Sequence, residues 1–204
     1  MPSVSYEPKE NESFEQYSAK HVGIARSFSV RKDSCNQPEH FTDYLLYNAL
    51  NDAQSGMGVT SVLVRYDENG APQSIMGYIT LKVSALLQDA DKGFTGKPAI
   101  EISELAVDKR FEGQGIGVAL LSYAVSCFYK IKETAGVMCM LVYAEPNAVG
   151  FYKHVLDFAE TKDIYEIPHE KWNASCVPMY LNMIIKNSSE PCYATDDDDE
   201  EDEI

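Results

Sequence analysis

The segment "RFEGQGIG", residues Arg110 to Gly117, places three glycines at alternate positions between an apolar run and a helical pattern. Small residues at a strand-to-helix junction allow successive backbone N–H groups to approach an anion closely. The dipole of the following helix adds partial positive charge at the same point. The loop is therefore a candidate anion site, and the glycines alone leave a plain structural turn open as the alternative.

Two familiar phosphate-binding patterns do not fit this loop. The dinucleotide pattern G-x-G-x-x-G fails because Val118 stands where the third glycine belongs, and the P-loop pattern G-x-x-x-x-G-K is absent. The strand pattern "AIEISELAV" before the loop contains two carboxylates, Glu101 and Glu104. Because these residues differ by three positions, regular strand geometry predicts that they point to opposite faces of a sheet.

The elements that would position these residues begin with a helix and a hairpin. Helical spacing predicts a helix that starts after Thr42 or Asp43 and stops at Gly56. The runs "VTSVLVRY" and "SIMGYITLKV" predict two strands, and Asn69–Gly70 between them predicts a tight turn. Residues 84–98 have no clear period and contain two glycines and a proline, so they are expected to form a loop.

Strands and helices alternate through the second half of the chain. The expected elements are a strand over 99–107, a helix over 116–131, a strand over 136–144, a short helix over 147–155 and a strand over 176–185. Pro178 would restrict the last strand to a sheet edge or to the strand's early part. This order predicts an α/β fold in a single domain, with a mixed central β-sheet flanked by helices.

The length and charge of the chain limit the classes of function. A chain of 204 residues with 45% hydrophobic residues suits one globular domain. Residues Asp196 to Glu203 are all acidic, which predicts a disordered tail over 187–204. Without these eight charges the net charge falls from −15 to about −7, so the remainder is acidic as well. Nucleic acid is therefore an unlikely partner on charge alone.

The sequence contains no signal for export or membrane insertion. The first 20 residues lack an apolar signal core and an arginine-rich transit pattern, and no segment approaches 18 consecutive apolar residues. The five cysteines are odd in number, widely spaced and without a C-x-x-C pair. We therefore expect a cytoplasmic protein that does not bind membranes and that has neither a disulfide framework nor a zinc site.

The segment "LAVDKRFEGQGIGVALL" resembles the pyrophosphate-binding segment of the GNAT superfamily of acyl-CoA N-acyltransferases. Arg110, Gly113 and Gly115 match the family pattern R/Q-x-x-G-x-G/A after a strand that ends in L-A-V. The expected helix and hairpin, together with "GVMCMLVYA" and "AVGFYKHVLDF", occur in the family's order. The resemblance implies a GNAT acetyltransferase domain over 40–186, preceded by an extension over 1–39 that holds a first strand or loop.

In that family the loop cradles the pyrophosphate of coenzyme A, so the resemblance implies acetyl-CoA as the co-substrate. The backbone of Leu105, Ala106 and Val107 would pair with the pantetheine arm. The phosphates would be held by Arg110, Phe111, Glu112, Gly113, Gln114, Gly115, Ile116 and Gly117.

Acetyl transfer to an amine requires a neutral amine, a stabilised oxyanion and a proton for the departing thiolate. This chemistry needs no metal. Tyr152 matches the tyrosine of the family's F-Y motif, which implies that it protonates the thiolate, and a phenol stays protonated at neutral pH. Glu101 stands at the strand position where several family members carry their base, so it is the candidate base. Many members instead lower the amine's pKa by desolvation, which leaves both carboxylates as ordinary strand residues.

The chain departs from the family pattern at two positions. Glu145 stands where the family often has Asn, which puts one pantetheine contact in doubt, and Asp157 stands where a glycine precedes the phenylalanine. The four histidines are scattered without metal-ligand spacing, and we assign them no role.

Within the superfamily, the combined motifs look most similar to toxin-type acetyltransferases, which acetylate the amino group of aminoacyl-tRNA. Those proteins are usually basic around the site, because tRNA must be held by its phosphates, whereas this chain is acidic. A tRNA acceptor would require Lys82, Lys92 and Lys97 to gather beside the site.

Three functions therefore stay open: acetylation of a small or protein-borne cationic amine, acetylation of aminoacyl-tRNA, and non-catalytic acyl-CoA binding. The net negative charge favours the first of them. A non-catalytic module would be expected to lose Tyr152 or the glycines, and both are present. The sequence also leaves the oligomeric state open, a homodimer included.

Overall fold

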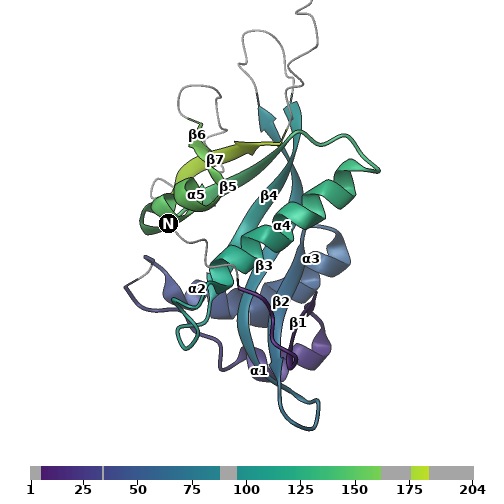
Figure 1. Cartoon of the computed structure of the whole chain (residues 1–204). Coiled ribbons are helices and arrows are strands. Elements are labelled where there is room, and N and C mark those ends of the chain that lie inside the picture. The colour runs from purple at the N-terminus through teal and green to yellow at the C-terminus, as the bar shows by residue number, and fades with distance from the viewer. Residues whose placement is uncertain (1–5, 34, 88–95, 162–175, 184–204) are drawn as a thin grey trace, which may run out of the picture.

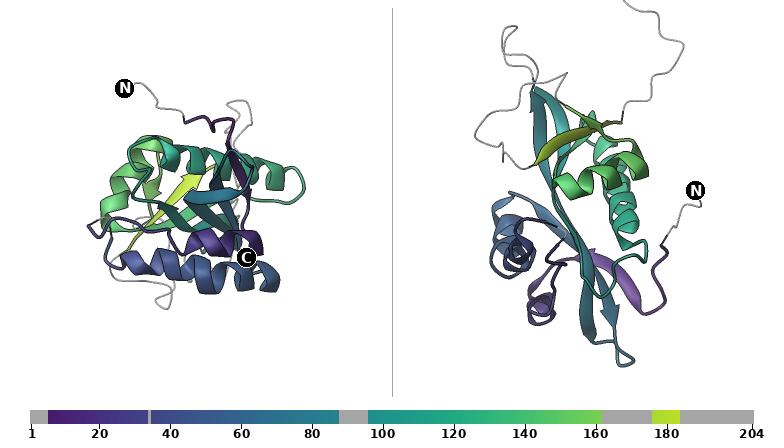
Figure 2. Two further views of the ribbon diagram at one scale, coloured as in Figure 1. Left: turned by 90° about the horizontal axis from the view of Figure 1, so that it is seen from below. Right: turned by 90° about the vertical axis from the view of Figure 1, so that its left-hand side faces the viewer.

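The computed structural model describes residues 6–33, 35–87, 96–161 and 176–183. These residues form a seven-stranded sheet with helices on both faces (Figures 1 and 2). In chain order the strands are β1 (Glu12–Gln16), β2 (Val59–Tyr66), β3 (Pro72–Leu87), β4 (Gly96–Val107), β5 (Cys139–Ala144), β6 (Ala159–Glu160) and β7 (Val177–Asn182). Their spatial order is β1-β2-β3-β4-β5-β7-β6, and β4 and β5 are the parallel pair in this otherwise antiparallel sheet.

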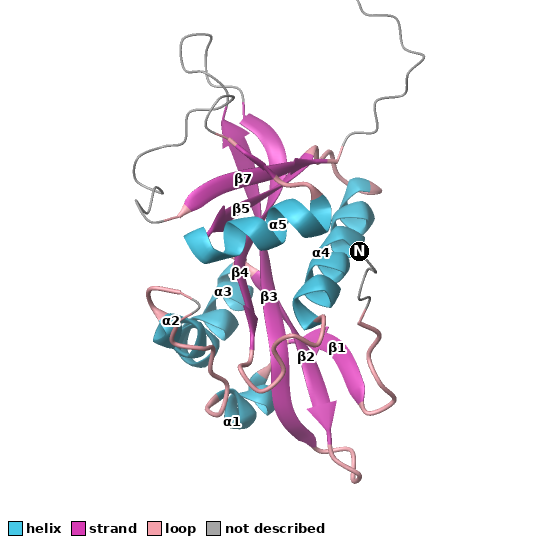
Figure 3. Cartoon of the chain, turned by 60° about the vertical axis from the view of Figure 1, so that its left-hand side comes forward, coloured by secondary structure: helices cyan, strands magenta, loops and turns pink. Residues whose placement is uncertain are grey.

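The helices form two layers. One layer contains α1 (Val22–Ala25), α2 (Pro38–Asp43) and α3 (Ala49–Ser55), and the other contains α4 (Ile116–Lys132) and α5 (Val149–Leu156). Short 3-10 turns, η1 (Ala19–His21) and η4 (Pro146–Ala148), precede α1 and α5, and a π-helical turn, η2 (Tyr44–Asn48), joins α2 to α3. Figure 3 shows α2 and α4 on opposite sides of β4.

Each face of the sheet has its own apolar core. On the α4 face, Ile79 and Ile102 pack with Leu120 and Phe128 of the helix. On the α2 face, Tyr78 packs with Tyr44, whose ring is stacked on it at 6.2 Å. The alternation of side chains along β3 supplies both cores, because neighbouring strand residues point to opposite faces.

The predicted mixed sheet flanked by helices is confirmed, and so is the hairpin, whose turn places Gly70 at a φ of 75°. The helix predicted to start after Thr42 or Asp43 instead begins at Pro38, and it ends as expected at Gly56, a left-handed C-cap. Proline is favoured in the first turn of a helix because its missing N–H would have no partner there.

The loop predicted over residues 84–98 is shorter than expected. Strand β3 continues to Leu87 and β4 begins at Gly96, because residues 84–87 and 96–99 pair with each other. That long-range pairing outweighs the weak local pattern. Residues 88–95 lie outside the described part of the chain, as does the predicted tail over 187–204.

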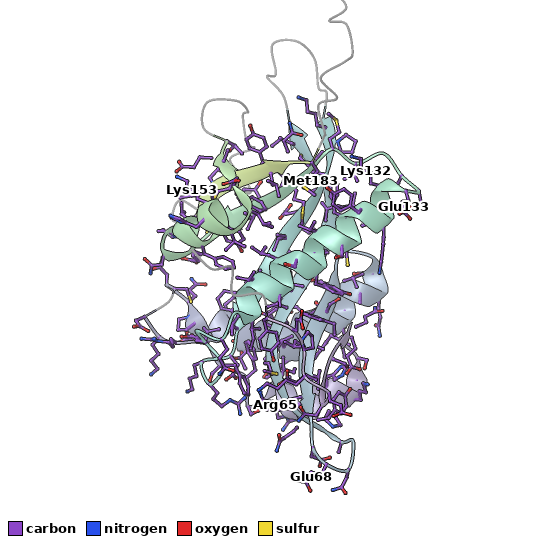
Figure 4. All side chains as sticks on the ribbon, viewed as in Figure 1. Arg65, Glu68, Lys132, Glu133, Lys153 and Met183 are labelled. Carbon is purple, nitrogen blue, oxygen red and sulfur yellow. The ribbon has the colours of Figure 1, made fainter. Side chains whose placement is uncertain are left out.

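The strand predicted over 176–185 forms β7, with Pro178 at its second position. Its end is tied to α4, since Lys132 Nζ donates to the backbone oxygen of Met183 at 3.2 Å (Figure 4). Among the described helices, none has both the length and the apolar character required to cross a membrane.

Gly77 of β3 lets the start of α4 approach the sheet. A Cβ built at this position would lie 3.0 Å from the backbone oxygen of Ala106, 3.0 Å from Leu120 Cδ1 and 3.1 Å from Ile116 Cγ2. The oxygen belongs to a paired strand and cannot move aside. We therefore expect Gly77→Ala to lower the free energy of unfolding by about 1–3 kcal/mol, measured by urea denaturation.

The matched control for this substitution is Gly136→Ala. No atom lies within 4 Å of a Cβ built on Gly136, so this variant should stay within about 0.5 kcal/mol of the wild type. Equal stabilities of the two variants would contradict the close approach of α4.

Candidate active site

A cavity of about 400 Å³ opens where β4 and β5 separate. Parallel pairing runs from Ala99 opposite Cys139 to Ile102 opposite Val142, whereas β4 continues to Val107. The cavity is lined by β4 from Ile102 onward, by the end of β5, by α2 and by α5. Backbone groups of β4 beyond the last pair therefore face the cavity and can bond to an extended ligand.

A β-bulge marks the point of separation. Thr80 of β3 pairs with Glu104 and Leu81 pairs with Ile102, so Ser103 is the extra residue in β4. Beyond a bulge, side chains of the bulged strand change face relative to regular alternation.

The bulge overturns the expectation that Glu101 and Glu104 point to opposite faces. Glu101 is opposite Lys82 and Glu104 is opposite Thr80, and these two β3 residues share one face. Both carboxylates therefore point to the α2 side of the sheet.

The two carboxylates nevertheless have different surroundings. Glu104 lines the cavity, and its Oε1 lies 3.0 Å from Nε2 of His40 on α2. Glu101 is 3% exposed, does not line the cavity, and pairs through Oε1 with Lys82 Nζ at 2.9 Å. Its Oε2 has no hydrogen-bond partner among the described residues. The structure therefore places Glu104, and not the predicted base Glu101, beside the opening.

Tyr152 enters the cavity from α5 on the other side of the sheet. Its ring packs edge-to-face against Phe151 and Phe158, and the residue is 5% exposed. Burial raises the pKa of Tyr152 above its ordinary value, and the negative charge of Glu104 raises it further. The phenol therefore stays protonated at neutral pH and can donate a proton to an anion in the cavity.

The glycine loop leads from β4 into α4. Gly113 and Gly115 have φ values of 72° and 84°, a conformation that residues with side chains rarely adopt. Gly115 is the N-cap of α4 and supplies no capping side chain, and the first N–H groups of a helix have no intrahelical partners. A Cβ on Gly117 would meet the Phe151 ring at 3.2 Å. The start of α4 thus has N–H groups without intrahelical partners at the positive end of a helix dipole.

Arg110 stabilises this loop by binding Asp108, which is fully buried. Its Nε lies 2.7 Å from Asp108 Oδ1 and its Nη2 lies 3.0 Å from Oδ2, a bidentate pair that raises the pKa of the guanidinium. Asp108 also accepts a hydrogen bond from the backbone N–H of Ser29 at 3.0 Å. One carboxylate therefore holds the start of the loop in place.

The other residues of the loop divide into core and cavity positions. Phe111 and Ile116 are buried in the α4-side core, so only their backbone groups can contact a ligand. The Gln114 amide reaches the backbone oxygen of Arg110 at 3.5 Å, and Glu112 lines the cavity with Arg31 3.6 Å away. Leu105, Ala106 and Val107 also line the cavity, as their predicted contact with a pantetheine arm requires.

Charged groups around the cavity are predominantly acidic. Glu104, Glu112 and Glu145 line it, and no lysine or arginine does so in the part of the chain that the structure describes. Hydrogen bonding to Glu104 raises the pKa of His40, with further contributions from Asp43 and Glu145. The cavity therefore favours a cation near its α2 side.

Sequence reasoning missed the contribution of α2. His40 precedes the predicted helix, and its distance of 64 residues from Glu104 in the chain gives no local signal of contact. The departure at Asp157 does have a structural counterpart, because this residue has a φ of 53°, where glycine is favoured.

The model of the Acetyltransferase (GNAT) family matches residues 22–158. Solved structures similar to the chain include a variant of KacT, with a TM-score of 0.64 and 18% identity over 85% of this chain and 95% of that one. An AtaT variant bound to the C-terminus of the antitoxin AtaR and acetyl-CoA has a TM-score of 0.63 and 18% identity, over 85% and 94% of the two chains.

AtaT complexed with acetyl-methionyl-tRNAfMet has a TM-score of 0.62 and 18% identity, over 82% of this chain and 93% of that one. At these identities the structural likeness establishes a shared fold.

Proposed function

The chain belongs to the GNAT family of acetyltransferases and is an acetyl-CoA-dependent N-acetyltransferase, and we propose that its acceptor is a cationic amine, small or protein-borne. The acidic lining of the cavity carries this proposal. An acceptor with a positive charge beyond its reacting nitrogen would be attracted by Glu104 and Glu145.

Acetyl-CoA would lie in the opening between β4 and β5. The free backbone edge of Leu105 to Val107 would bond to the amides of the pantetheine arm, as an added strand does. The N–H groups between Gly113 and Gly117 would hold the pyrophosphate at the start of α4. This arrangement would direct the thioester toward Tyr152 and Glu104.

Transfer then proceeds by attack of the neutral amine on the thioester carbonyl. A C–N bond forms, the tetrahedral intermediate collapses, and the C–S bond breaks to release the thiolate of coenzyme A. Tyr152 donates its phenolic proton to this thiolate, and its raised pKa keeps it in the protonated form beforehand.

Acetylation of an amine panel, followed by thiol release, tests the acceptor. We expect diamines and lysine-like amines to have higher kcat/KM values than monoamines of similar size. Because the attraction is electrostatic, this preference should fall several-fold between low and high ionic strength. A preference for monoamines, or one that does not respond to salt, would contradict the proposed acceptor class.

Aminoacyl-tRNA is the alternative acceptor, since AtaT is similar in fold and binds acetyl-methionyl-tRNAfMet. Of the three lysines that this acceptor would require, Lys82 pairs with Glu101 and Lys97 does not line the cavity, while Lys92 lies outside the described residues. Expression of wild type and Tyr152→Phe, with aminoacyl-tRNA assayed for acetylation, separates the two acceptors. Growth arrest by wild type alone, together with acetylated tRNA, would favour tRNA.

A further inference from the structure

The attacking amine must lose one proton during transfer, and the residue predicted to accept it, Glu101, is paired with Lys82 outside the cavity. We propose that His40 accepts this proton and that Glu104 positions the imidazole and stabilises its protonated form. This proposal rests on the proposed N-acetyltransferase function, and it names a proton acceptor for the same cavity.

The contact between His40 and Glu104 has the geometry of such a pair. The distance between Nε2 and Oε1 is 3.0 Å, and both residues line the cavity with Tyr152. With a proton on Nε2 that is donated to Glu104, the other ring nitrogen, Nδ1, is left to accept a proton. The Glu104 side chain is 14% exposed and that of His40 is 45% exposed, so the pair connects the interior of the cavity with solvent.

The backbone that carries His40 is held in place by its neighbours. The Tyr78 hydroxyl donates to the backbone oxygen of Phe41 at 3.0 Å, and the Thr42 hydroxyl donates to that of Phe28 at 2.9 Å. The His40 ring also packs against the rings of Phe41 and Tyr44. These contacts limit the positions that the imidazole can occupy, which favours a fixed contact with Glu104.

Two different residues, His40 and Tyr152, account for the protons that move during the reaction. The amine nitrogen passes one proton to His40 as the C–N bond forms, and Tyr152 passes one proton to sulfur as the C–S bond breaks. His40 then releases its proton to solvent and Tyr152 regains one. Because Tyr152 approaches from the α5 side and His40 from the α2 side, the acid and the base lie on opposite sides of the opened strands.

Charges around His40 determine the pH range of this role. Glu104 of β4, Asp43 of α2 and Glu145 beside η4 all raise the pKa of His40 above its ordinary value of about 6.5. The active form has a neutral imidazole, so activity should increase as the pH rises through this elevated pKa. The neutral fraction of a lysine-like amine, whose pKa is about 10, also increases over this pH range, so kcat/KM must be calculated on the concentration of neutral amine before the titration of His40 is read from it.

The test compares pH profiles of kcat/KM for the best amine of the panel in wild type, His40→Gln, Glu104→Gln and Glu101→Gln. We expect the wild-type rate to rise with a midpoint above pH 6.5. In Glu104→Gln the midpoint should fall, because the negative charge that stabilises the protonated imidazole is lost. In His40→Gln this rise should disappear, with a loss of about tenfold to a hundredfold at high pH.

Glu101→Gln is the matched control, since it makes the same chemical change on the same strand outside the cavity. It should retain the wild-type midpoint. A second measurement is independent of activity: NMR titration of the His40 ring should show its pKa falling in Glu104→Gln and not in Glu101→Gln.

Two results would contradict the proposed roles of His40 and Glu104. One is a His40→Gln enzyme with the wild-type midpoint, and the other is a midpoint that shifts only in Glu101→Gln. Absence of thiol release by wild type with every amine would instead overturn the proposed function, so the two failures are distinguishable.

Discussion

Tyr152→Phe is expected to lower kcat by roughly tenfold to a hundredfold while leaving the affinity for acetyl-CoA almost unchanged. The substitution removes only the hydroxyl that would protonate the departing thiolate. The ring keeps its edge-to-face contacts with Phe151 and Phe158, so the core around α5 should stay intact. Steady-state kinetics with calorimetric titration of acetyl-CoA measure the two quantities separately.

Tyr143→Phe is the matched control, because Tyr143 of β5 lines the same cavity and loses the same group. It should retain kcat within a few-fold of wild type. If Tyr152→Phe retained wild-type turnover, the role of Tyr152 would be limited to packing. Equal losses in both variants would indicate a general effect of polarity in the cavity.

Gly115→Glu is expected to weaken coenzyme A binding by about a hundredfold or more, which corresponds to about 2.7 kcal/mol. The new side chain places a negative charge at the N-terminus of α4, where the pyrophosphate would be bound. It also occupies a position whose φ of 84° favours glycine, so part of the effect is on backbone conformation.

Gly70→Glu separates these two effects. Gly70 lies in the turn between β2 and β3, has a φ of 75°, and has no atom within 4 Å of a built Cβ. The variant therefore carries the same charge and a similar backbone penalty away from the cavity. It should bind coenzyme A like wild type in isothermal titration calorimetry. Unchanged affinity in a folded Gly115→Glu would contradict the assignment of the loop.

Features that depend on neighbouring residues could be predicted from the sequence. The turn at Asn69–Gly70 and the helix stop at Gly56 follow from backbone preferences of single residues, and both are observed. The same holds for the strand, glycine loop and helix around Arg110 to Gly117, whose order is encoded within one continuous segment. The fold class follows from the succession of these elements.

Strand pairing was harder to predict from the sequence than these local features. The strand β1 has no hydrophobic alternation strong enough to identify it, and it forms because its backbone pairs with β2 at the sheet edge. The extension of β3 to Leu87 likewise depends on its partner β4. Such pairings add stability through contacts between residues far apart in the chain, which local patterns do not record.

The sequence by itself determined the family, and it identified the glycine loop as a candidate anion site and Tyr152 as a candidate acid, because each is encoded in a short continuous segment. Only the tertiary structure decided which carboxylate faces the cavity. The bulge at Ser103 exists through the register between β3 and β4, and it turns Glu104 toward α2. The separation of β4 from β5 then lets His40 and Tyr152, from opposite faces of the sheet, reach one cavity. Strand register and helix placement arise from packing across the whole domain, so residue types and spacing could not reveal this arrangement.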